Sequence, residues 1–215
     1  MTWLPVYNAF CLGLFLISAI FWQLWGILLF FIVFSFSTLY LWLETTFINI
    51  HFVDGYWLFI LSEFIVFVSL LTSCLWFYES EFLHLSHASD IPLFGCFLLL
   101  SSSISVTAYH HELCLNKKSS LNLLVSILLG VGFVFLQGFE FYECSEDILN
   151  SSYHASCFCT VGLHFSHVVI GLILLSGCLS MGVNTLGIYY STTIIWYWHF
   201  VDYIWLLVYL VVYIC

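Results

Sequence analysis

The stretch that decides the fold is residues 156–180, SCFCTVGLHFSHVVIGLILLSGCLS. It contains no aspartate, glutamate, lysine or arginine. A helix needs about 17–25 predominantly apolar residues to cross the ~30 Å hydrocarbon core of a membrane, and this run is long enough. The stretch therefore predicts a transmembrane helix.

The same hydropathy pattern recurs along the rest of the chain. Six further apolar runs cover residues 5–22, 25–43, 55–78, 91–111, 120–142 and 190–214. We therefore predict an all-α integral membrane protein with seven transmembrane helices. Six spans is the main alternative, because the first two runs are short and only residues 23–26 separate them.

Composition supports a membrane protein and excludes several other classes. Apolar residues make up 63% of the 215 residues and charged residues only 7%, whereas a soluble domain carries about 25% charged residues. A soluble enzyme, a secreted disulfide scaffold and a disordered chain are thereby excluded. The formal net charge of −10 leaves no basic surface for phosphate neutralisation, so we expect no nucleic-acid partner.

The entire basic content of the chain lies at Lys117 and Lys118. The positive-inside rule places this loop in the cytoplasm or the mitochondrial matrix. Alternation then puts the N-terminus on the same side, and the C-terminus and the acidic stretches 79–90 and 143–147 on the other. No basic leader or transit peptide precedes the first apolar run, so we expect synthesis beside the membrane, in a bacterium or an organelle. The absence of arginine favours an organelle genome.

The nine cysteines are expected to be buried free thiols rather than metal ligands or disulfides. Most lie inside apolar runs, where a thiol behaves as a small hydrophobe. The closest pair, Cys157 and Cys159, has an i,i+2 spacing that puts the two side chains on nearly opposite faces of a helix. We therefore predict no metal site formed by cysteines.

Carboxyl groups inside the apolar runs are the first candidates for function, because ionisable groups at membrane depth are costly. They are Glu63, Glu140 and Asp202. Because both lysines lie in one loop, only histidine could serve as their basic partner. We expect Glu63 to carry its proton unless a histidine or bound water ionises it. The structural alternative is a neutral carboxyl that hydrogen-bonds a neighbouring helix.

Histidines accompany these carboxyls at helical spacing. His164 and His167 are separated by three residues, as are His199 and Asp202, so each pair shares a helix face. The first pair supplies too few ligands for a closed metal site, and helix packing is the favoured interpretation. The second pair could orient an imidazole for proton transfer or satisfy both groups between helices; we favour the structural role.

Other side chains are expected near the lipid headgroups. His110 and His111 end the run 91–111 on the lysine side, and Trp57 lies near the start of the run 55–78. Tryptophans at the ends of spans commonly act as interfacial anchors.

Five segments together resemble the cytochrome c oxidase subunit III family, part of the haem-copper oxidase group. They are WYWHFVD at 196–202, GLHFSHVVIG at 162–171, QGFEFYE at 137–143, SVTAYHH at 105–111, and Ser62-Glu63 followed by Trp76-Phe77-Tyr78. The resemblance is ordered and covers about residues 55–215. Residues 1–54 match only loosely.

The resemblance implies a fold of seven helices split around a lipid cleft into helices 1–2 and helices 3–7. On this basis we expect a hairpin with its connecting loop at 1–54 and a five-helix bundle at 55–215. Glu63 would be the cleft carboxyl that supports proton uptake. Glu140, His164, His167, His199 and Asp202 would form a polar framework between helices. Because the arginines that contact phosphates in this family are missing, His51, His110, His111, Lys117 and Lys118 are the remaining candidates for lipid headgroups.

The resemblance also implies the functional setting. The chain would be a non-catalytic core subunit of cytochrome c oxidase in the mitochondrial inner membrane, or alternatively in a bacterial plasma membrane. It would hold structural phospholipid but no catalytic residue, metal or cofactor of its own. Haem a and copper would lie on partner subunits. Its partners would be subunit I as the main contact, subunit II, accessory subunits and a respiratory supercomplex.

Three other functions are left open by the sequence. A quinol oxidase has an equivalent subunit, and its electron donor docks elsewhere. A secondary transporter or proton channel could use Glu63 and the histidines as a relay, and it would be active alone in vesicles. A membrane scaffold without an energetic role would require all five motifs to be coincidental.

Overall fold

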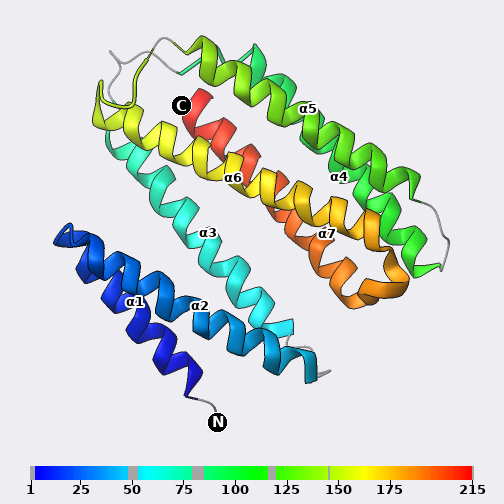
Figure 1. Ribbon diagram of the computed structural model, residues 1–215. Coiled ribbons are helices and arrows are strands. Elements are labelled where there is room, and N and C mark those ends of the chain that lie inside the picture. The colour runs from blue at the N-terminus through cyan, green and yellow to red at the C-terminus, as the bar shows by residue number, and fades with distance from the viewer. Residues whose placement is uncertain (1–2, 48–52, 79–84, 116–119, 145, 215) are drawn as a thin grey trace. The chain divides into compact units, whose positions relative to one another are not determined.

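The computed structural model describes residues 3–47, 53–78, 85–115, 120–144 and 146–214, all of whose regular structure is helical (Figure 1). Contacts within the chain divide it into two compact units, Met1–Val53 and Asp54–Cys215. The all-helical prediction is confirmed over the described residues. His51, Lys117 and Lys118 lie outside them.

The first unit is a helical hairpin of α1, Leu4–Ile20, and α2, Leu24–Phe47. Trp22 forms the turn between the helices and has a positive φ of 52°. The rings of Phe15 and Phe30 pack across the hairpin with their centroids 4.8 Å apart. This aromatic contact holds the two helices of the hairpin together.

The second unit contains the remaining elements. These are α3 at Val53–Trp76, α4 at Ile91–Cys114, α5 at Leu121–Glu143, α6 at Ser152–Met181, α7 at Val183–Val208 and the terminal π-helix η1 at Tyr209–Ile214. The backbone of α4 packs against α5 and α7, and that of α6 also packs against α5 and α7. Figure 1 shows α4 and α5 side by side.

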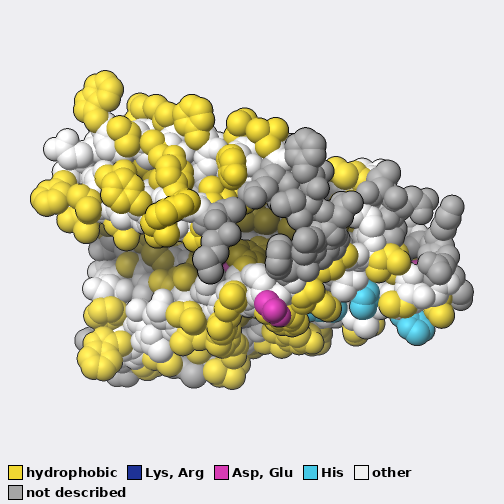
Figure 2. All heavy atoms as spheres, turned by 90° about the horizontal axis from the view of Figure 1, so that it is seen from below, with side chains coloured by type: hydrophobic (Ala, Val, Ile, Leu, Met, Phe, Trp, Pro, Cys, Tyr) yellow, Lys and Arg dark blue, Asp and Glu magenta, His cyan; other side chains and the backbone are white. Residues whose placement is uncertain are grey.

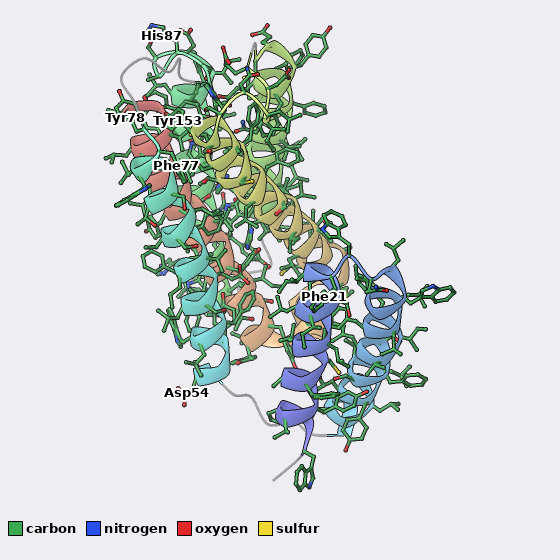
Figure 3. All side chains as sticks on the ribbon, turned by 90° about the vertical axis from the view of Figure 1, so that its left-hand side faces the viewer. Phe21, Asp54, Phe77, Tyr78, His87 and Tyr153 are labelled. Atoms are coloured by element: carbon green, nitrogen blue, oxygen red, sulfur yellow. The ribbon has the colours of Figure 1, made fainter. Side chains whose placement is uncertain are left out.

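Helix α3 is joined to the rest of the second unit by side chains along its length. Near its start, the hydroxyl of Tyr56 donates a 2.8 Å hydrogen bond to the carbonyl of Thr193 in α7. Just beyond its end, the ring of Tyr78 lies 5.8 Å, centroid to centroid, from that of Tyr153 in α6. Figure 3 shows Tyr78 close to Tyr153, with Asp54 at the opposite end of α3. Helix α3 thus contacts α7 near its start, and the residues just beyond its end contact α6.

Within the described residues, six helices are long and apolar enough to cross a membrane, while α1 is an apolar helix of 17 residues. The observed helices overlap all seven predicted runs, but their ends differ by up to several residues, most clearly at the starts of α6 and α7. Helix α6 begins four residues earlier than predicted because the hydroxyl of Ser151 caps it, accepting a 3.1 Å hydrogen bond from the amide of His154. Helix α7 also begins earlier, and it is kinked at Gly187, where φ is 80°.

Many large hydrophobic side chains of the protein are exposed. Figure 2 shows one face, on which hydrophobic side chains predominate and acidic and histidine side chains form small separate groups. Soluble monomers rarely expose apolar patches larger than a few hundred Å². The surface therefore agrees with the multi-span membrane architecture.

Trp198 occupies the centre of the five-helix unit. Its side chain is fully buried, and its indole N–H donates a 3.0 Å hydrogen bond to the hydroxyl of Ser102 in α4. A Cβ atom at Gly130 in α5 would lie 2.8 Å from the indole, and one at Gly171 in α6 would lie equally close. The two glycines are therefore required for α5 and α6 to approach the tryptophan.

We predict that Gly171→Ala will lower the free energy of unfolding by about 1–3 kcal/mol, the usual cost of overpacking a core. Gly177→Ala in the same helix is the control, because its Cβ would meet nothing within 4 Å. The control should be neutral or slightly stabilising, since alanine favours helix. Thermal unfolding of the purified protein in detergent measures both, and equal midpoints for the two variants would contradict the packing argument.

Candidate functional site

The carboxyl group of Glu63 in α3 contacts the imidazole of His167 in α6. Glu63 Oε2 lies 3.1 Å from His167 Nε2. The Glu63 side chain is 27% exposed, whereas that of His167 is 10% exposed. The contact therefore joins two helices of the second unit and leaves the carboxyl accessible from outside the bundle.

The hydrogen bond of the other ring nitrogen of His167 determines how many protons lie between Glu63 and the imidazole. His167 Nδ1 lies 2.8 Å from the carbonyl oxygen of Leu163, which can only accept a hydrogen bond, so Nδ1 carries a proton. The hydrogen bond to Glu63 then contains one proton. Either the carboxylic acid donates to a neutral imidazole, or the imidazolium donates to a carboxylate. The pair has no net charge in either form.

Aromatic side chains hold the His167 ring in place. Phe67, one helical turn after Glu63, is buried and packs edge-on to the imidazole with the ring centroids 5.3 Å apart. Tyr197 of α7 stacks on the imidazole at a centroid distance of 6.3 Å. The ring is therefore fixed by packing as well as by its two hydrogen bonds.

His164 shares a helix face with His167, as predicted, but has a different partner. Its Nε2 atom donates to the carbonyl of Val201 in α7 across 3.2 Å, and the residue is 1% exposed. Trp205 packs against its ring at a centroid distance of 4.9 Å. His164 thus connects α6 to α7 inside the bundle and does not join His167 in a common ligand set.

His199 and Asp202 are not hydrogen-bonded to each other. The Nδ1 atom of His199 lies 2.8 Å from the hydroxyl of Ser103, and its Nε2 atom lies 3.4 Å from that of Thr107, both in α4. Asp202 is 1% exposed, and neither of its carboxyl oxygens has a hydrogen-bond partner among the described residues. The spacing correctly predicts that His199 and Asp202 share a helix face. The imidazole, however, contacts the hydroxyls of α4 and not the carboxyl of Asp202.

Glu140 lies in a polar cluster that the sequence only partly indicates. Its Oε2 atom accepts a 2.6 Å hydrogen bond from the side-chain amide of Gln137, and its Oε1 atom accepts one of 2.6 Å from the hydroxyl of Ser86. Glu140 and Gln137 are both buried. The i,i+3 spacing would have revealed Gln137, whereas Ser86 lies in the segment before α4 and carries no local signal.

The described residues expected near lipid headgroups differ in exposure. Trp57 is 52% exposed and packs against Trp196 with ring centroids 5.4 Å apart. His111 is exposed and His110 is half-buried near the end of α4. Across the described part of the chain, no group of three or more His, Cys, Asp or Glu side chains could hold a metal ion.

These features define a class of protein: a multi-span helical membrane protein whose buried polar side chains connect its helices. The chain belongs to the cytochrome c oxidase subunit III family, whose family model matches residues 3–215.

Individual relatives agree with this assignment. Cytochrome c oxidase subunit 3 of Spodoptera frugiperda is 36% identical over 133 residues, covering 58% of this chain and 88% of that protein. The proteins of the same name from Loxodonta africana and Mus musculus are 39% and 35% identical over 133 residues. These matches cover 58% of this chain but 50% of either relative. The chain thus spans about half the length of the latter two relatives.

We predict different effects on stability from replacing the buried carboxyls of Glu140 and Asp202. Glu140→Leu leaves the buried amide of Gln137 without its acceptor and should cost about 1–3 kcal/mol of stability. Asp202→Leu removes a carboxyl that has no hydrogen-bond partner and should be neutral or stabilising. Thermal unfolding in detergent measures both variants. A destabilised Asp202→Leu protein beside an unaffected Glu140→Leu protein would contradict this interpretation of the two sites.

Proposed function

We propose that this chain is a core accessory subunit of cytochrome c oxidase, the complex that couples electron transfer from cytochrome c to oxygen with proton pumping. The observation that carries the proposal is the family match over residues 3–215. Haem a and copper would reside on partner subunits, with subunit I as the main contact and subunit II nearby. The lack of a metal-binding cluster in the described residues is compatible with this division.

We further propose that Glu63 and His167 form the functional site of the subunit. The pair can pass its single proton between carboxyl and imidazole without creating net charge in the membrane. The partial exposure of Glu63 lets lipid or water reach the carboxyl, while His167 faces the bundle. This arrangement suits a carboxyl that supports proton uptake and the stability of the complex during turnover.

Structural phospholipid would surround this site, and the complex would lie in the mitochondrial inner membrane. The exposed Trp57 and His111 and the half-buried His110 are the described candidates for headgroup contacts. The loop with Lys117 and Lys118 supports a matrix location for the N-terminus under the positive-inside rule. The composition without arginine supports an organelle genome.

The first test is to isolate the intact complex. Membranes are solubilised gently, complexes are separated on a native gel, and a haem absorption spectrum is taken of the band that contains this chain. We expect haem a and cytochrome c oxidation in that band. A haem-free species with proton flux of its own in vesicles would overturn the proposal in favour of a transporter, and quinol oxidation without cytochrome c oxidation would indicate a quinol oxidase.

The second test concerns the carboxyl group itself. We predict that Glu63→Gln will assemble, because the amide can still donate to His167, but will inactivate faster during sustained turnover because the amide cannot exchange a proton. Oxygen consumption recorded over many turnovers measures the rate of inactivation. Glu112→Gln is a matched control, since Glu112 is a half-buried carboxyl of α4 that accepts a 3.0 Å hydrogen bond from Asn122. Unchanged inactivation in the assembled Glu63→Gln complex would remove Glu63 from the functional site.

A further inference from the structure

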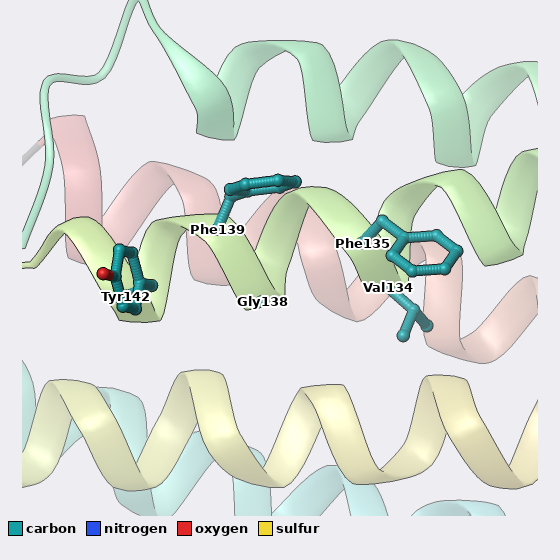
Figure 4. Close-up of a pocket in the computed structure, with 5 residues that line it drawn as sticks. All are labelled: Val134, Phe135, Gly138, Phe139 and Tyr142. Atoms are coloured by element: carbon teal, nitrogen blue, oxygen red, sulfur yellow. The ribbon is translucent and has the colours of Figure 1, made fainter.

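A shallow apolar groove of about 400 Å³ lies on the outer face of α5. It is lined by Val134, Phe135, Gly138, Phe139 and Tyr142. Figure 4 shows all five on α5, with Gly138 between Phe135 and Phe139. Three of them are large and exposed: Phe135 is 66% exposed, Phe139 61% and Tyr142 87%. The groove therefore faces away from the bundle core.

Gly138 forms the floor of this groove. A Cβ atom at this position would meet nothing within 4 Å, so the space above the glycine is open. Val134, Gly138 and Tyr142 follow one another at i,i+4 spacing, and rows of this spacing form the ridges and grooves through which helices pack. In membranes, a small residue in such a row lets another helix approach closely. The shape of the groove suits a helix crossing α5 at Gly138.

An exposed acidic residue follows Tyr142 at one end of the groove. Glu143 is exposed at the end of α5, and it makes no hydrogen bond or ion pair with any residue the structure describes. The carbonyl end of a helix is itself partially negative and favours cations, but the last turn of α5 has no basic residue. Asp147 is exposed four residues further along. The only lysines of the chain, Lys117 and Lys118, precede the opposite end of α5.

We propose that this groove is the docking site of a transmembrane helix from another polypeptide. That helix would place a small residue over Gly138 and a lysine or arginine beside Glu143. The charge distribution favours such a helix over an anionic phospholipid, whose phosphate would be repelled by Glu143. Tyr142 marks the level of the headgroups, where tyrosine is enriched.

Filling the groove tests the proposal in the complex purified from its own membranes. Gly138→Leu should reduce retention of one membrane polypeptide by about tenfold, the effect of a single strongly contributing interface residue. Gly177→Leu on α6 is the same substitution at another glycine whose added Cβ atom would meet nothing within 4 Å. The complex with this variant should retain that polypeptide. Glu143→Gln should weaken retention of the same polypeptide and reduce its dependence on salt.

Crosslinking identifies the occupant even where Gly138→Leu fails to assemble. Phe135→p-benzoylphenylalanine is introduced into the otherwise unchanged chain, irradiated in native membranes and analysed by mass spectrometry. We expect a crosslink to a transmembrane segment flanked by lysine or arginine, in the polypeptide that Gly138→Leu loses. Crosslinks to lipid alone, or to residues 3–47 of this chain, would overturn the proposal. So would full retention of all polypeptides by an assembled Gly138→Leu complex.

Discussion

The scarcity of basic side chains is the constraint on which the polar interior of this protein depends. With no arginine and both lysines in one loop, carboxyl groups at membrane depth cannot pair with a permanent cation. Glu63 contacts a histidine, and Glu140 accepts hydrogen bonds from an amide and a hydroxyl. A buried charge without such partners would be far more costly than a hydrogen-bonded neutral group. Histidines, amides and hydroxyls thus take the place that arginine and lysine occupy elsewhere.

These polar contacts also connect the helices. Among the described residues, three polar contacts attach α3 to its neighbours: Tyr56 binds the backbone of α7, Glu63 binds α6, and the thiol of Cys74 lies 3.5 Å from the hydroxyl of Thr160 in α6. They are distributed from one end of α3 to the other, on a helix whose backbone stands further from its neighbours than α4 does from α5. Because lipid gives helices little hydrophobic reason to associate, such bonds determine which face of α3 turns inward.

The sequence predicted most of the fold but only part of the site. Apolar runs located every helix, because each span must be both long and apolar. Spacing correctly placed His164 and His167 on one face, yet it could not identify their partners, which lie on α7 and α3. The same spacing put His199 and Asp202 on one face, but it could not identify Ser103 and Thr107 on another helix as the partners of the imidazole. Ser86 was missed for the same reason, since its bond to Glu140 depends on tertiary packing alone.

The neutrality of the Glu63–His167 pair has a consequence for an energised membrane. A lone charge that moves across the bilayer exchanges about 2.3 kcal/mol with the field for every 100 mV of potential. An acid and a base that share one proton carry no net charge, so a shift of α3 or α6 that carries both groups together does almost no electrical work. In a membrane, the contact between these helices would therefore be nearly insensitive to the potential.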